Sequence, residues 1–251
     1  MSLYRKLALS DHWFARAVRR CHRAVNRFSV PAPKLIFIPI LSTVLVLRQL
    51  WYFVYRVFFC EPLFKAYCRS YGKSVHTDVY FHWIQGSGDL LLGDNVLIDG
   101  KCSFCFAARF SEAPTLSIGD NTSVGHHCTF VVGKRITIGK DCRIASDVLL
   151  FDSPGHPLDP EKRQAGFPPD LESIRPITIG NNVWLGTGAV IFPGVTVGDN
   201  SIVSVHAVVM SDVPSNVVVS GNPARKILSL EPNRTGPAKD NLRPHSVEQI
   251  D

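Results

Sequence analysis

The sequence predicts a mainly β protein, a parallel β-helix of hexapeptide repeats that follows an α-helical region at the N-terminus. Six hexads succeed one another without a gap from Ile179 to Pro214, and each begins with Ile, Leu or Val. Before about residue 84 this period is absent, and apolar residues recur at helical spacing instead. Three hexads make one triangular coil, and stacked coils form parallel sheets around a continuous apolar core.

The first helical segment is predicted over residues 12–28. Phe14, Val18 and Val25 share one face, whereas Arg16 and Arg20 begin a series of arginines on another face. Residues 1–70 contain 12 basic and 2 acidic residues, a net charge of +10, and the remaining 181 residues carry 15 minus 19, or −4. A protein that binds nucleic acid concentrates positive charge around its working site, so this distribution argues against nucleic acid as a partner.

Residues 35–60 are unusually apolar, but Pro39, Arg48 and Arg56 interrupt them, so the segment does not predict a clean transmembrane span. Trp51 and Tyr52 suit the headgroup zone of a membrane. We therefore interpret residues 1–70 as a basic, apolar region that associates peripherally or monotopically with a membrane. The alternative is a helical pair that packs on the rest of the protein or on a neighbouring subunit.

The β-helix domain is predicted over residues 71–228. Its fifth hexad positions are small or β-branched, and Cys102, Cys128 and Cys142 occupy such positions, which predicts core residues rather than metal ligands or disulfide partners. Seven cysteines in this pattern fit a reducing cytoplasm. Residues 151–176 break the period with five prolines and a histidine, so we expect a functional loop there. Residues 229–251 are predicted to form a mobile polar tail.

Three motifs carry a family resemblance: the loop core Ser153-Pro-Gly-His-Pro-Leu-Asp159, the segment Asn181-Asn-Val-Trp184, and Gly221-Asn-Pro-Ala-Arg225. With them, residues 90–228 resemble the maltose and galactoside O-acetyltransferases and the related colanic acid acetyltransferases. The resemblance implies a left-handed β-helix, a homotrimer with sites between subunits, and acetyl-CoA as the acetyl donor. It also implies transfer to a sugar hydroxyl. Together with the membrane-associating residues 1–70, this predicts a role at the cytoplasmic membrane face, in cell-surface polysaccharide or lipid-linked saccharide synthesis.

By the same resemblance, His156 is the general base. An alcohol attacks a thioester competently only as its proton is removed, and the imidazole side chain, with an ordinary pKa of about 6.5, suits that task. Asp152, Asp159 and Glu172 are candidates to orient or stabilise the imidazole, although each is equally explained as a turn residue. The substrate-binding candidates are Asp159 and Glu172 of the loop, together with His126 and His127 at the turn of a neighbouring hexad. Solvated turn histidines explain His126 and His127 equally well.

The resemblance assigns coenzyme A to a set of residues that begins at Trp184. These residues are Trp184, Thr187, Val205, Met210, Ser211 and Arg225. The family usually has lysine where this chain has Ser211, so Arg225 or Lys226 would have to hold the phosphates. The acceptor-binding aspartate and asparagine of the family align near Gly133 and Gly125, which implies an acceptor other than a simple galactoside.

Three other functions fit parts of the pattern. An amino-sugar N-acyltransferase, or an acyltransferase with another donor, would use the same fold, and donor screening would separate these activities. A catalytically inactive trimeric scaffold at the membrane would not need the histidine loop. Zinc-dependent carbonic anhydrases share the β-helix, but no histidine pair here has the H-x4-H spacing expected of them, so we expect no metal site.

Overall fold

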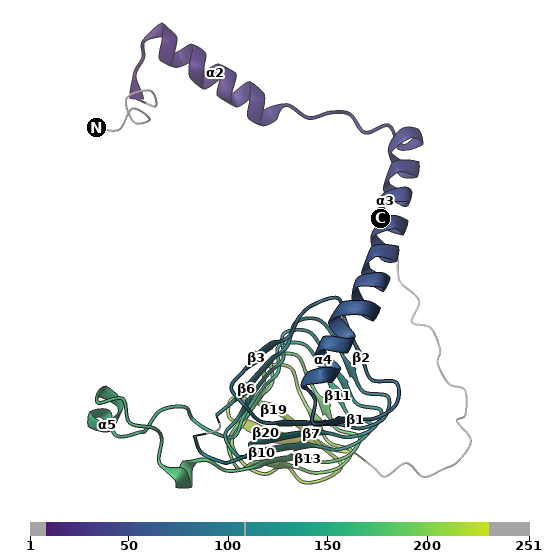
Figure 1. The fold of residues 1–251 in the computed structure, drawn as a ribbon. Coiled ribbons are helices and arrows are strands. Elements are labelled where there is room, and N and C mark those ends of the chain that lie inside the picture. Colours follow the sequence, from purple (N-terminus) through teal and green to yellow (C-terminus); the bar gives the residue numbers. More distant parts are fainter. Residues whose placement is uncertain (1–8, 108, 231–251) are drawn as a thin grey trace, which may run out of the picture. The chain divides into compact units, whose positions relative to one another are not determined.

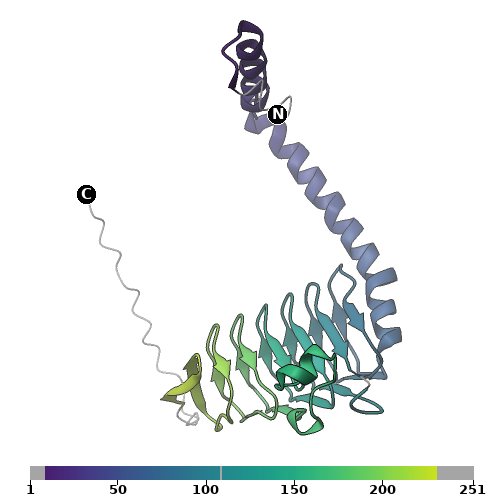
Figure 2. The same cartoon turned by 90° about the vertical axis from the view of Figure 1, so that its left-hand side faces the viewer.

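The computed structural model describes residues 9–107 and 109–230. The chain divides into two compact units between Trp51 and Tyr52. The second unit is a prism of triangular cross-section with one parallel sheet on each side (Figure 1). Successive coils stack along the prism in chain order (Figure 2). This arrangement confirms the predicted parallel β-helix and is consistent with a left-handed coil.

The three sheets are named A, B and C. Sheet A contains β1 (Ser70–Tyr71), β4 (Asp89–Leu92), β7 (Thr115–Ile118), β10 (Arg135–Ile138), β13 (Ile177–Ile179) and β16 (Thr196–Val197). Sheet B contains β2 (His76–Thr77), β5 (Leu97–Ile98), β8 (Ser123–Val124), β11 (Arg143–Ile144), β14 (Trp184–Leu185), β17 (Ile202–Val203), β19 (Val217–Gly221) and β20 (Ala224–Ser229). Sheet C contains β3 (Trp83–Gln85), β6 (Ser103–Phe106), β9 (Thr129–Val132), β12 (Leu149–Phe151), β15 (Val190–Ile191) and β18 (Val208–Val209). The named strands pair in parallel, except that β19 and β20 are antiparallel.

The prism core consists of the residues that the hexad pattern places inward. The first residues of the hexads, such as Ile179 and Leu185, are buried. Phe104 and Phe130 stack in successive coils with ring centroids 5.4 Å apart, which fills the widest part of the core. The three cysteines predicted to be core residues are buried, and all seven cysteines are free thiols.

The prism begins at β1, within one residue of the predicted start of the β-helix domain at residue 71. Strands β1 and β2 already pair with β4 and β5, although the hexad pattern becomes visible only from about residue 84. The reason is that Tyr71 and Thr77 occupy the first positions of these early hexads, where later coils have Ile, Leu or Val. At the other end, β20 runs to Ser229, one residue into the predicted tail, and residues 231–251 lie outside the described part of the chain.

The corner between sheets A and B carries a ladder of asparagine side chains. The Nδ2 group of Asn182 donates to Oδ1 of Asn200, and Nδ2 of Asn200 donates to Oδ1 of Asn216, each at 3.0 Å. A second run joins Asn95 and Asn121 and ends on the Asp141 carboxylate, which has no proton to donate onward. These ladder residues have positive φ, a conformation that asparagine tolerates better than most residues.

The substitution Asn200→Ala is expected to lower the free energy of unfolding by about 2 kcal/mol, because it removes two ladder hydrogen bonds and places alanine at φ 59°. The matched variant Asn200→Gly also removes the ladder but adopts positive φ freely, so about 1 kcal/mol of that loss should be recovered. Urea unfolding with unchanged m-values is the measurement. Equal stability of the alanine and glycine variants would show that backbone conformation makes no contribution at this corner.

The helices before the prism are α2 (Trp13–Arg27), α3 (Lys34–Tyr55), a π-helical turn η1 (Arg56–Cys60) and α4 (Glu61–Tyr67). Phe64 of α4 is buried against Phe104, with ring centroids 5.8 Å apart, so α4 closes the first coil of the prism. No residue of α3 is buried. By length and composition alone, the segment Lys34–Tyr67 is the one described helix long and apolar enough to cross a membrane.

Candidate active site

The predicted loop is an excursion of residues 152–176 from the corner between sheets C and A (Figure 1). It contains the short helix α5 (Pro160–Gln164) and the 3₁₀ turn η2 (Leu171–Ser173). The two ends of the excursion are held together, because the Arg175 backbone N–H donates to the Asp152 carbonyl at 2.9 Å. The Arg175 carbonyl in turn accepts from Gly194 N–H in the next coil at 2.9 Å. The loop therefore leaves and re-enters the prism at a fixed point.

The buried side chain of Asp152 also stabilises the corner between sheets C and A. It is fully buried, and its carboxylate accepts hydrogen bonds from the backbone N–H groups of Gly133, Lys134 and Arg135, the latter two at 2.7 Å. Burial raises the pKa of Asp152, and the three N–H donors oppose that rise. Asp152 was a candidate to orient His156, but its oxygens are directed at the preceding corner. It supports the loop base instead.

A side chain would be crowded at Gly133 and would meet the backbone at Gly125, the two positions near which the acceptor-binding residues of the resembling family align. A Cβ at Gly133 would lie 3.0 Å from Ser153 Cβ and 3.2 Å from Asp152 Oδ1. A Cβ at Gly125 would lie 2.8 Å from the Ser146 backbone nitrogen. The buried Asp152 thus takes up space beside Gly133.

His156 lies near the start of the excursion and its side chain is exposed. Gly155 precedes it with φ 78°, a conformation that a residue with a side chain rarely adopts, and Pro157 follows it with its ring buried. No described residue forms a hydrogen bond or an ion pair with the His156 imidazole. The ring is therefore presented to solvent from a braced turn, with its nitrogens open to a ligand.

The two other acidic candidates of the loop do not approach His156 through a recorded contact. Asp159 caps the N-terminus of α5, where its carboxylate accepts from Glu161 N–H at 2.8 Å and Lys162 N–H at 3.1 Å. The hydrogen bond from Lys162 N–H, followed by that from Glu161, lowers the pKa of Asp159. Glu172 is exposed in the first turn of η2. The assignment of Asp159 to substrate is thus weakened by its local role as a cap.

His126 and His127 lie at the corner between sheets B and C, whereas the His156 loop leaves the corner between C and A. His126 Nε2 is 3.2 Å from Asp99 Oδ2, and His127 Nδ1 is 3.6 Å from Asp147 Oδ1. Both histidines are exposed. One chain therefore does not bring these histidines together with His156, and a site that contains all three would need a second copy.

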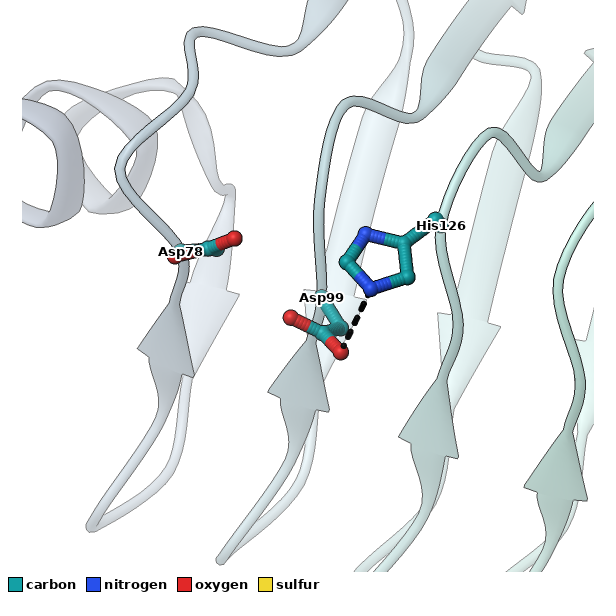
Figure 3. A group of neighbouring side chains, drawn as sticks. All are labelled: Asp78, Asp99 and His126. Carbon is teal, nitrogen blue, oxygen red and sulfur yellow. Dashed lines mark ion pairs between the residues drawn. The ribbon is translucent and has the colours of Figure 1, made fainter. Parts of the chain in front are cut away.

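His126 also belongs to the one group of possible metal ligands found in the described residues. Asp78, Asp99 and His126 come from three successive coils, and their ligand-type atoms lie within 4.8 Å of one another (Figure 3). Within the group, Asp99 and His126 form an ion pair, whereas Asp78 accepts a 2.7 Å hydrogen bond from the backbone N–H of its neighbour Val79. An exposed ion pair explains this cluster, and we assign no metal to it.

The residues expected to hold coenzyme A fall into two groups. Thr187 and Val205 lie at the corner between B and C, next to the exposed Trp184 on β14. Met210 and Ser211 lie at the corner between C and A. A groove at the C-terminal end of the prism is lined by Ser211, Pro214, Arg225 and Lys226, among others. The structure thus joins Ser211 to Arg225 but places Thr187 and Val205 on another edge.

The supporting role of Asp152 is the site feature that the sequence did not reveal. One hint in the sequence is that Asp152 directly follows the apolar strand β12, at the corner where the chain leaves sheet C. Interactions with residues 17–19 positions earlier leave no local pattern. One hydrogen-bond partner of this carboxylate is Gly133, and a glycine at that position is the second hint in the sequence.

Comparison with known families identifies the repeats. A family model described as the hexapeptide repeat of succinyl-transferase matches residues 115–150 and 176–205. The galactoside O-acetyltransferase of Escherichia coli K12 is 43% identical over 118 residues, which are 47% of this chain and 56% of that protein. A solved galactoside acetyltransferase in complex with coenzyme A is 31% identical, with 75% of this chain and 77% of that chain covered and a TM-score of 0.48.

A second solved structure supports the fold alone. The N-acyltransferase AntD from Bacillus cereus, in a complex with dTDP and coenzyme A, has a TM-score of 0.55 at 21% identity, with 68% of this chain and 89% of that chain covered. The chain spans little more than half the length of the curated relatives it matches, from 54% to 60% for the first few. The matched parts contain the prism strands on both sides of the His156 loop.

Proposed function

Because the chain belongs to the hexapeptide-repeat acetyltransferase family, we propose that it transfers an acetyl group from acetyl-CoA to a hydroxyl group of a sugar. The observation that carries the proposal is the exposed His156 on a loop whose two ends are fastened to the prism. A base for an alcohol must be held in place and be open to its substrate, and the fastened loop ends and the exposed imidazole support this role for His156.

In the proposed reaction, an imidazole nitrogen of His156 accepts the proton of the acceptor hydroxyl as the hydroxyl oxygen attacks the thioester carbonyl. The carbon–sulfur bond then breaks, and the proton held by His156 passes to the departing thiolate of coenzyme A. Acetyl ester and free thiol are the products, so the histidine returns to its neutral form. Backbone or side-chain donors near the loop would stabilise the oxyanion.

The proposed site is shared between copies of the chain in a homotrimer. The separation of His156 from His126, His127, Thr187 and Val205 onto different corners supports this, because a neighbouring copy could bring one corner against another. The lack of space at Gly125 and Gly133 favours an acceptor other than a simple galactoside. We place the acceptor among cell-surface polysaccharides or lipid-linked saccharides.

The test is acetyl transfer by the purified full chain in detergent, with free sugars, amino sugars and membrane-extracted lipid-linked saccharides as acceptors. Thiol release should depend on one acceptor, and mass spectrometry should find an acetyl ester on it. An acetyl amide on an amino sugar would replace the proposed O-transfer by N-transfer. No release with any acceptor, together with no binding of acetyl-CoA, would overturn the proposed function.

The groove at the C-terminal end predicts how the donor phosphates are held. The substitution Arg225→Ala is expected to raise the KM for acetyl-CoA about tenfold with a smaller change in kcat, because an arginine–phosphate contact contributes about 1.5–3 kcal/mol. The matched variant Ser211→Lys adds the family's cation to the same groove and should lower that KM. Steady-state kinetics at fixed acceptor measure both effects. An unchanged KM in the alanine variant would place the phosphates elsewhere.

A further inference from the structure

Residues 12–60 contain no acidic side chain, although they carry eight arginines and lysines. Five of these cations are the arginines of α2, a helix whose opposite face exposes Phe14, Val18 and Val25. Cations on one face and exposed apolar side chains on the other fit a helix that lies flat on an anionic lipid surface. Charge complementarity therefore identifies the partner of this unit as a membrane rather than a second protein.

Helix α3 is apolar and none of its residues is buried, so lipid is the surrounding that its side chains fit. Its longest stretch without a charge is residues 35–47, which is about 20 Å of helix and contains Pro39. A hydrocarbon core of about 30 Å needs about 20 apolar residues. Because Lys34 and Arg48 bound the stretch, this uncharged run alone is shorter than a span. An α3 that crossed the bilayer would place Arg48 inside the hydrocarbon, so an interfacial segment fits the charges better.

The charges of α2 also indicate on which side of the membrane each unit lies. A spanning α3 would put α2 and the prism on opposite sides of the membrane. The arginines of α2 favour the cytoplasmic, anionic face, and the prism would then lie outside, away from acetyl-CoA. An α3 that lies within one leaflet, without reaching the other face, keeps both units on the cytoplasmic side.

We propose that α2 and α3 form a monotopic anchor in the cytoplasmic leaflet of an anionic membrane, with α2 and the prism on the same side. The sidedness rests on the proposed use of acetyl-CoA. Trp51 and Tyr52 are placed near the headgroups at the end of α3. The burial of Cys60 marks where the chain has left the lipid and joined the prism. A lipid-linked acceptor would then be confined to the same surface as the enzyme.

The test uses full-length protein in sealed vesicles from bacterial cells, prepared inverted and right-side-out. In a Cys21→Ser background, one reporter is Ala24→Cys, which lies between Arg23 and Arg27 on α2, and the other is Ser229→Cys on β20. The Cys21→Ser parent gives the background from the half-buried native thiols. Both reporters should react with a membrane-impermeant maleimide at least tenfold faster in inverted vesicles than in right-side-out vesicles.

The matched variant Val25→Cys, on the apolar face of α2, should react at least several-fold more slowly than Ala24→Cys until detergent is added. Reporters that react from opposite faces would show a spanning α3, and protein that stays in the supernatant after sedimentation would show no membrane anchor. Both reporters reacting only from the outer face, or equal rates at residues 24 and 25, would also overturn the proposal. Acetyl transfer is assayed separately in detergent, so a failure of topology and a failure of catalysis are distinguished.

Discussion

Replacement of His156 by alanine is expected to lower kcat/KM for the acceptor by about 100- to 10,000-fold, the range that a positioned general base contributes. The side chain is exposed and makes no recorded contact with the described residues, so its loss should leave folding and oligomeric state unchanged. Acetyl-CoA should still bind with near-normal affinity, because the imidazole acts on the acceptor proton. Thiol release under saturating acetyl-CoA, with circular dichroism and sedimentation on the same samples, measures these properties.

The matched control is His76→Ala. His76 is likewise exposed, and its one ion pair, with Glu61 at 3.2 Å, is a surface contact at the first coil, which is worth about 1 kcal/mol or less. Its turnover should equal that of the wild type. If His156→Ala retained more than a tenth of the wild-type kcat/KM, His156 would not be the base, and the His126–Asp99 pair would become the next candidate.

The fold was accessible from sequence because its rule is local and repeated. The first residue of each regular hexad points into the prism and is buried. Ile179 and Leu185 follow this rule, as do the first residues of the hexads after them. Where the repeat is disguised, the hexad pattern is not visible in the sequence. Tyr71 and Thr77 conceal the first coil, although their strands pair in register with those of the second coil.

The site was less accessible because it depends on which corner of the prism a residue occupies. The sequence predicted the loop of His156 and its exposed position, but it did not show that His126 and His127 belong to a different corner. Each coil has three corners, and the separation becomes clear only when the strands before His126 and before His156 are assigned to different sheets. Any group that a neighbouring copy would contribute to the proposed site cannot be read from one chain.

Replacement of Asp152 by alanine is expected to have the largest effect on stability, a loss of about 2–4 kcal/mol in the free energy of unfolding. The carboxylate is the partner of three backbone N–H groups at a buried corner, and each donor left without a partner costs about 1–3 kcal/mol, reduced where water can enter. Asp152→Asn should lie between alanine and wild type, because an amide keeps the volume but offers one acceptor oxygen. Urea unfolding provides the measurement.

The control Asp120→Asn changes an exposed carboxylate that accepts one backbone N–H, from Asp94, and should cost less than about 1 kcal/mol. If Asp152 had only a structural role, its replacement by alanine would lower stability, but the protein that remained folded would keep the wild-type kcat. Because the carboxylate fixes the corner from which the His156 loop leaves the prism, we expect instead that kcat also falls, while KM for acetyl-CoA stays within about twofold of wild type. The backbone hydrogen bond between the Asp152 carbonyl and Arg175 N–H is kept in this variant. A stable Asp152→Ala variant with normal kcat would show that the prism holds the His156 loop without this carboxylate.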